Sequence, residues 1–292
     1  MYTVTLITAP TARTLSAPAV AGLLEHWQGQ GLRWLAPGAA AEFSVPELPA
    51  DHWPVWEEWQ AQRTDLVIQP SAGRRKKMLL ADMDSTMIEQ ECIDELAAAA
   101  GFGPQVAAIT ARAMNGKLDF EGALLARVGL LRGLPQPVIA QVLDEHITLS
   151  PGGRTLLATM KAQGAYAALV SGGFTAFTAA VAAQLGFDEH RANTLLLEGG
   201  RLTGEVARPI LGRQAKVAAL LDITARLGLE PDDVLAVGDG ANDLGMLELA
   251  GTGVALHAKP AVAAQCEVRI NHGDLTALLY LQGYAESEFV SV

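Results

Sequence analysis

Cysteine and long apolar runs are both scarce in this sequence. Only Cys92 and Cys266 occur among 292 residues, and neither belongs to a Cys-x-x-Cys pair. A disulfide framework is therefore excluded, and both residues are expected to be small buried thiols. No run approaches the roughly 18 apolar residues that a membrane span needs, and the first residues lack the basic and apolar segments of a secretory leader. We expect a soluble cytoplasmic protein with no membrane partner.

Positive charge is scarce as well. Lysine and arginine number 21 against 32 aspartate and glutamate residues, which gives a net charge of −11. This balance argues against nucleic acid as a partner, and it means that an anionic ligand needs local positive charge at its site. Zinc is disfavoured too, because the chain has neither a His-x-x-x-His motif nor a cluster of cysteine and histidine.

Tryptophan is absent after residue 59, although five occur up to and including that position. This break predicts a separate small α+β domain at residues 1–71, whose patterns follow the order βαββαβ. In element order and position this domain resembles the ACT-type modules. Its tryptophans have three explanations: packing in the core, an amino-acid site, or the surface of a homodimer. The five are Trp27, Trp34, Trp53, Trp56 and Trp59.

Strand-like and helix-like patterns alternate over most of residues 72–292, which predicts a doubly wound, Rossmann-like parallel sheet. The exception is a stretch at about 88–147, where helical periodicity continues without a convincing strand. We predict that this stretch is a helical cap inserted into the α/β domain. Its helices are expected at 88–100, 104–115, 120–132 and 136–146.

Polar residues follow the apolar strands of the predicted sheet. Asp82 and Asp84 come at the end of one strand, Ser171 at the end of another, and Asp239 and Asp243 at the end of a third. The carboxyl ends of parallel strands share one edge, where open α/β sheets bind ligands, so these residues are expected to converge. Residues i and i+2 of a strand start on the same side, so Asp82 and Asp84 are predicted to face one reactive centre.

Several carboxylates at one edge repel one another unless a cation lies between them. Oxygen-only ligands favour Mg²⁺, which typically combines a few carboxylates with water and phosphate oxygens. Together with Ser171 and Lys216, such a site suits phosphoryl transfer, which needs an in-line nucleophile and neutralised charge. Asp82 is predicted to be the nucleophile that forms an aspartyl-phosphate, and Asp84 the acid and base.

Four motifs in this order resemble those of the haloacid dehalogenase superfamily of aspartate-nucleophile phosphatases. They are Asp82–Thr86, Ser171–Gly173, Lys216 and Gly238–Asp243. Within that superfamily the chain is most similar to the phosphoserine phosphatase family, and the resemblance covers about residues 76–284. The segments that carry this second likeness are Glu89–Glu95, Met114–Phe120, Arg127–Val128, Val170–Phe174 and Val237–Asp243 with Met246.

The resemblance implies hydrolysis of O-phosphoserine to serine and phosphate, the last step of serine biosynthesis, by a phosphatase domain at residues 72–292. It implies Mg²⁺ bound by Asp82, the Asp84 carbonyl and Asp239, with Asp243 beside it. The remaining roles concern the substrate. The phosphate is surrounded by Ser171, Gly172, Lys216 and Asn242, the ammonium pairs with Glu91 and the carboxylate with Arg127, and Met114 and Phe120 close the pocket.

Alternatives stay open at this point. The same chemistry fits another small phosphomonoester, or phosphoryl transfer to a second alcohol. A different class of protein, a regulatory binding protein with a phosphatase fold, also fits, although the intact set of acidic residues argues against it. In the cap, Glu91 and Arg127 fit a surface ion pair as well as substrate contacts, and Phe120 fits helix packing.

Overall fold

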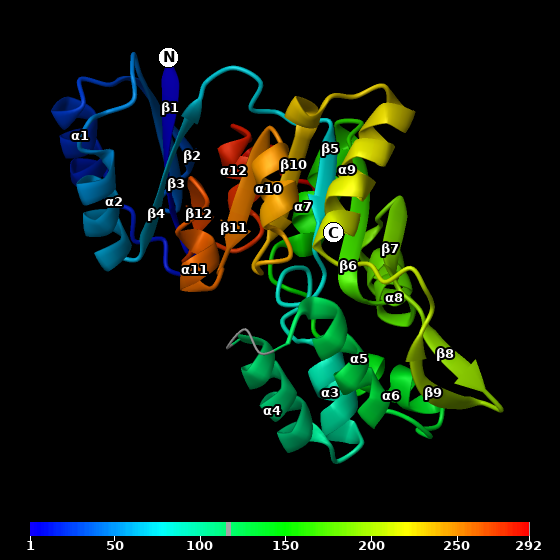
Figure 1. Ribbon diagram of the computed structural model, residues 1–292. Helices are drawn as coiled ribbons and strands as arrows, with labels where there is room; N and C mark the ends of the chain where they lie inside the picture. Colours follow the sequence, from blue (N-terminus) through cyan, green and yellow to red (C-terminus); the bar gives the residue numbers. More distant parts are fainter. Residues whose placement is uncertain (115–117, 292) are drawn as a thin grey trace.

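The computed structural model describes residues 1–114 and 118–291, apart from the side chains of residues 113 and 114. Two β-sheets organise it, a small antiparallel one near the N-terminus and a larger parallel one (Figure 1). A group of helices lies beyond one end of the larger sheet (Figure 1). Within the described residues, no helix is both long enough and apolar enough to cross a membrane.

The small sheet has four antiparallel strands in the order β2-β3-β1-β4. Two helices cover one face, where Val4 and Leu6 of β1 pack with Val20 and Leu23 of α1. The predicted βαββαβ order is confirmed. The elements are β1 (Tyr2–Thr8), α1 (Ala17–His26), β2 (Gln30–Ala36), β3 (Ala40–Val45), α2 (His52–Ala61) and β4 (Thr64–Pro70).

The larger sheet has six parallel strands in the order β12-β11-β10-β5-β6-β7, with helices on both faces, which confirms the predicted fold class. Its strands are β5 (Met78–Ala81), β6 (Tyr166–Phe174), β7 (Glu189–Asn193), β10 (Val234–Gly238), β11 (Thr252–Leu256) and β12 (Val268–Ile270). Its helices are α7 (Gly153–Ala162), α8 (Thr175–Leu185), α9 (Arg213–Leu227), α10 (Leu244–Leu249), α11 (Pro260–Ala263) and α12 (Ala277–Leu281).

Between β5 and α7 the chain forms four consecutive helices, as the periodicity predicts. They are α3 (Cys92–Ala99), α4 (Gly103–Met114), α5 (Phe120–Leu130) and α6 (Pro137–Glu145). A hairpin of β8 (Leu195–Glu198) and β9 (Arg201–Val206) lies beside α5 and α6 (Figure 1). The expected start of the first helix at residue 88 is wrong, because Ile88 instead bridges Leu149 in extended pairing and the helix begins four residues later.

The sequence patterns did not separate three strands of the large sheet, which are β7, β11 and β12. The pattern of β7 contains the charged side chains of Glu189 and Arg191, since it is an edge strand, and β12 has only three residues. Ser171 was predicted to come at the end of a strand, but β6 continues to Phe174, so the Ser-Gly-Gly sequence lies within the strand rather than in a loop beyond it.

Helix α12 packs against the face of the small sheet that α1 and α2 leave free. One apolar cluster contains Ile7 and Val67 from the small sheet together with Leu278, Tyr280 and Leu281 from α12. The small sheet is therefore buried on both faces, and the two parts of the chain share a continuous core.

Candidate active site

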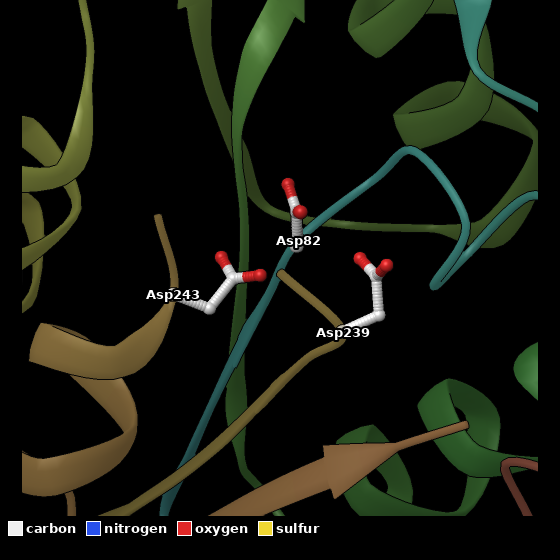
Figure 2. A group of neighbouring side chains, drawn as sticks. All are labelled: Asp82, Asp239 and Asp243. Atoms are coloured by element: carbon white, nitrogen blue, oxygen red, sulfur yellow. The ribbon is translucent and has the colours of Figure 1, made fainter. Parts of the chain in front are cut away.

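Asp82 and Asp239 come directly after two neighbouring strands of the large sheet. Strands β5 and β10 pair in parallel, and the amide of Asp82 donates to the Val237 carbonyl at 3.0 Å. Asp243 lies in the loop before α10, where its Oδ2 accepts the amide of Gly240 at 2.9 Å. The three carboxylates point toward one another in Figure 2, and an oxygen of each lies within 4.8 Å of the others. The predicted convergence of these three residues is confirmed.

Lys216 of α9 supplies the positive charge in this group. Its ammonium lies 2.5 Å from Asp243 Oδ1 and 2.6 Å from Asp82 Oδ1, and its side chain is only 2% exposed. Burial alone lowers the pKa of Lys216, but the two carboxylates outweigh it and raise that pKa above its ordinary value. The lysine is therefore a fixed cation at neutral pH.

One lysine does not neutralise three buried carboxylates. Burial and the charge of Asp243 raise the pKa of Asp82 well above its usual range, although Lys216 opposes the rise. Burial, Asp243 and Glu91 raise the pKa of Asp239 to about 7. Oδ1 of Asp82 is paired with the Lys216 ammonium and has no other polar partner among the described residues. This surplus of buried oxygen ligands fits a hard divalent cation.

Asp84 lies just outside the three-carboxylate group. Its Oδ1 accepts the amide of Cys92, the first residue of α3, at 3.1 Å, and a Cβ at Gly173 would lie 2.6 Å from its Oδ2. Glycine is thus required at 173 for this close approach. Burial, with the nearby charge of Glu91, raises the pKa of Asp84 to about 6. A carboxyl with this pKa is suited to give and take protons near neutral pH.

The route by which Asp84 reaches the site differs from the predicted one. Strand β5 ends at Ala81, so strand alternation does not orient the pair. A tight turn does so instead: the amides of Thr86 and Met87 donate to the Met83 carbonyl, and Ser85 adopts a left-handed conformation with φ of 53°.

The Ser-Gly-Gly segment at the end of β6 lies against Asp84, as the close approach at Gly173 shows. Ser171 is buried, and its Oγ accepts the amide of Gly173 at 2.8 Å. Asn193, which the sequence did not single out, holds this segment: its Nδ2 donates to the Gly172 carbonyl at 2.9 Å, and its Oδ1 accepts the Leu211 amide at 2.8 Å. An isolated asparagine at the end of an edge strand carries no sequence signal for this role.

Phe120, the first residue of α5, reaches across to the large sheet. A Cβ at Gly172 or at Gly212 would lie 3.1 Å from its ring, so the ring lies over both glycines. Phe120 thus brings the helical segment against the Ser-Gly-Gly sequence, and its predicted role in closing a pocket stays a prediction. Met114 was also predicted to close the pocket, but its side chain is outside the described part of the structure. Residues 115–117 are outside it altogether.

Glu91 and Arg127 do not form the ion pair that the sequence left open, since no bridge joins them among the described residues. Glu91 Oε1 accepts the Ser85 hydroxyl at 2.9 Å, and its charge acts on both Asp84 and Asp239. Arg127 Nε donates to the carbonyl of Ala123 one turn before it, at 3.3 Å. Its remaining guanidinium nitrogens have no carboxylate partner within the described part of the chain.

Residues 79–248 match the family model of the haloacid dehalogenase-like hydrolases. That segment contains all four motifs and the residues of the site described above. The chain belongs to the haloacid dehalogenase-like hydrolase family.

Relatives and solved structures agree with this membership. A curated phosphoserine phosphatase from Streptomyces coelicolor is 45% identical over 86% of the chain, which spans 62% of that relative's length, less than two thirds. A HAD family hydrolase from Salmonella enterica serovar Typhi matches over 99% of this chain and 100% of its own, with a TM-score of 0.87 and 34% identity. A phosphoserine phosphatase solved with an analogue of the phospho-aspartyl intermediate matches 70% of this chain and 98% of its own, with a TM-score of 0.66 and 38% identity.

The last of the predicted site residues is Asn242, which lies between Asp239 and Asp243 in the same loop. A Cβ at Gly240 would lie 2.4 Å from Asn242 Oδ1, so glycine at 240 allows the asparagine side chain to fold back over the loop. The hydrolase motif around Asp239 therefore depends on a small residue at 240 to place its amide side chain.

Proposed function

We propose that the protein is a phosphatase that hydrolyses O-phosphoserine to serine and phosphate through an aspartyl-phosphate intermediate. The observation that carries this proposal is the buried group of Asp82, Asp239 and Asp243 around the Lys216 ammonium, at the carboxyl edge of the sheet. The relative and the solved structure that are named phosphoserine phosphatases support the choice of substrate.

Mg²⁺ is the proposed cofactor, since the three carboxylates offer oxygen ligands only and lie within 4.8 Å of one another. Asp82 and Asp239 would hold it together with the Asp84 carbonyl, with Asp243 beside them. When bound, the cation supplies neutralisation of charge on the phosphoryl oxygens.

The reaction begins with Asp82, whose carboxylate attacks the phosphorus of the substrate while the bond to the serine oxygen breaks. Lys216 holds the carboxylate of Asp82 in place and balances part of the negative charge. Asp84, with a pKa of about 6, gives its proton to the leaving serine oxygen and then takes one from the water that cleaves the aspartyl-phosphate. Ser171, Gly172 and Asn242 surround the phosphoryl group.

Recognition of the amino acid belongs to the helical segment in this proposal. Glu91 faces the substrate ammonium, and Arg127 binds the substrate carboxylate, because a planar guanidinium suits two carboxylate oxygens. Phe120 over Gly172 excludes water from the reacting atoms. We also propose a division of the chain into an ACT-like domain at residues 1–71 and a phosphatase domain at 72–292, with a helical cap at about 88–147 inserted into the phosphatase domain.

Two further features stay predictions. A homodimer through the N-terminal domain is checked by sedimentation of the purified protein, and a cytoplasmic location by fractionation of the source cells. Neither changes the chemistry at the carboxyl edge.

The substrate assignment is tested by comparing Arg127→Ala with the unchanged protein on two substrates in the presence of Mg²⁺. We expect KM for phosphoserine to rise by about 10-fold or more, since a charged hydrogen bond contributes roughly 1.5–3 kcal/mol. KM for p-nitrophenyl phosphate, which has no carboxylate to bind, should change little.

Arg132→Ala is the matched control, because Arg132 lies just after α5 and its one ion pair among the described residues is with the exposed Glu205. Equal effects of Arg127→Ala on both substrates would overturn the assignment of phosphoserine and favour another small phosphomonoester.

A further inference from the structure

A buried carboxylate of the small sheet binds a loop of the large domain. Asp65 of β4 is fully buried, and its two oxygens accept the consecutive amides of Asn271, His272 and Gly273 at 2.9, 3.0 and 2.8 Å. Gln60 donates to the same carboxylate at 3.3 Å. Three successive amides around one anion form a tight and directional site. The 271–273 loop is thus held by a residue more than 200 positions away in sequence.

The 271–273 loop in turn holds the segment after β11. The Nε2–H of His257 donates to the Gly273 carbonyl at 2.8 Å, and its amide donates to the Ile270 carbonyl at 2.8 Å. His257 has a φ of 45°, a left-handed conformation that a histidine adopts only where its surroundings hold it. The two bonds to the loop region are such a support.

Two residues after His257, Lys259 lies beside the loop that carries Asp239. Its amide donates to the Asp239 carbonyl at 3.4 Å, and its exposed ammonium has no carboxylate within ion-pairing distance among the described residues. Burial, Asp243 and Glu91 raise the pKa of Asp239, and Lys259 opposes that rise. It also opposes the rise that burial and Glu91 cause at Asp94 of α3. The ammonium therefore acts between the aspartate loop and the helical segment.

The excess of negative charge in the protein allows Lys259 a role in attracting an anionic substrate. The protein carries a net charge of −11, and the cation nearest the reacting atoms, Lys216, is already bound by two carboxylates. A dianionic phosphomonoester approaching the edge meets Glu91, Asp94 and Asp239 as like charges. An exposed cation beside the Asp239 loop raises the local concentration of such an anion.

We propose that Lys259 steers the anionic substrate into the active site, and that Asp65 is a positioning residue that holds Lys259 there through the 271–273 loop and His257. The N-terminal domain thereby contributes to catalysis without touching the substrate. This inference rests on the proposed phosphatase function but not on phosphoserine as the substrate, because any phosphate dianion responds to the same charge.

The experiment measures kcat/KM for p-nitrophenyl phosphate and for phosphoserine over a range of ionic strength with Mg²⁺ present. Lys259→Gln should lower kcat/KM by about threefold to tenfold at low salt and flatten its salt dependence. Lys259→Arg should restore both. Asp65→Asn should produce the same change in salt dependence, because an Asn amide group presents a donor where the loop amides need an acceptor.

The two effects should not add. In the Asp65→Asn, Lys259→Gln double variant, kcat/KM should equal that of Lys259→Gln alone. A steeper loss in the double variant, or an unchanged salt dependence in Lys259→Gln, would overturn the proposal. If the unchanged protein hydrolyses neither substrate, the proposed function itself is overturned.

Two further variants separate positioning from stability. His257→Asn tolerates a positive φ but is too short to reach Gly273, so it should reproduce the flattened salt dependence without touching the interface of the two domains. Glu42→Gln weakens the ion pairs to Arg33 and Arg74 in that same interface, and Glu42 forms no hydrogen bond or ion pair with the 271–273 loop or His257 among the described residues. It should lower Tm as Asp65→Asn does and leave the salt dependence unchanged. A flattened salt dependence in Glu42→Gln would assign the effect to general loosening and contradict the proposal.

Discussion

The two sheets of this protein bury charge for different purposes. In the small antiparallel sheet, Asp65 is surrounded by amide donors, and Glu42 is paired with two arginines. In the large parallel sheet, Asp82, Asp239 and Asp243 share a single ammonium. The first arrangement is satisfied, and the second keeps an excess of negative charge.

This difference separates structure from chemistry. Buried polar groups that are fully hydrogen-bonded fix one arrangement of two domains, whereas groups left under-satisfied raise their pKa and remain available for a ligand. Removing charge from the small sheet should therefore cost stability and affect activity only indirectly, through the position of Lys259, whereas removing it from the edge of the large sheet should cost activity directly. The predictions that follow test each half of this contrast.

The largest expected effect is that of Asp82→Asn. The amide is not a competent nucleophile toward phosphorus, so phosphate release should fall by at least about 10³-fold. Because one of three crowded carboxylates loses its charge, Tm of the protein without metal should stay equal or rise. Steady-state phosphate release and thermal unfolding check both parts, and near-normal turnover would exclude Asp82 as the nucleophile.

Deletion of residues 1–71 should have the next largest effect. It exposes the apolar face of α12, including Tyr280 and Leu281, and removes the anion that holds the 271–273 loop. We expect the remaining chain to aggregate or to unfold at a lower temperature, as judged by size-exclusion chromatography and Tm. A monomeric product with unchanged Tm and activity would show that the shared core contributes little.

A smaller effect is expected from Mg²⁺ on stability, and it depends on pH. The pKa of Asp84 is raised to about 6 and that of Asp239 to about 7, both above the ordinary aspartate value of about 3.9. Between about pH 4 and 7 the folded protein without metal thus binds more protons than the unfolded chain, so its free energy of unfolding falls as pH rises.

A bound cation offsets the repulsion among the buried carboxylates only at a pH where these carboxyls are ionised. Millimolar Mg²⁺ should raise Tm by a few degrees at about pH 8 and by much less at about pH 5. Asp239→Asn, which removes one proposed ligand, should lose most of the difference between the two pH values. An equal rise in Tm at both would contradict the assignment of these carboxyls to a metal site.

The convergence of Asp82, Asp239 and Asp243 could be predicted because the carboxyl ends of parallel strands share an edge. The binding of Asp65 to the amides of residues 271–273 could not, since backbone amides have no sequence signature. Asn193 escaped prediction for the same reason, because it holds the Gly172 carbonyl and the Leu211 amide rather than another marked side chain.

The predicted boundaries of helices and strands were wrong where other contacts of the backbone override the local sequence pattern. The expected helix at residue 88 begins instead at Cys92, since Ile88 pairs with Leu149 across a short bridge. The orientation of Asp84 likewise comes from a turn around Ser85, although the sequence pattern suggested continued strand alternation. In the first case a contact distant in sequence decided the backbone, and in the second a tight local turn did.

The central claim is that Asp82 carries the phosphoryl group during turnover. It is tested most directly by quenching the protein in acid during hydrolysis of phosphoserine with Mg²⁺, followed by peptide mapping by mass spectrometry. We expect a phosphoryl group on Asp82, in the peptide that also contains Asp84, and none in Asp82→Asn. A phosphoryl group on another residue, or turnover without any phosphorylated peptide, would contradict it.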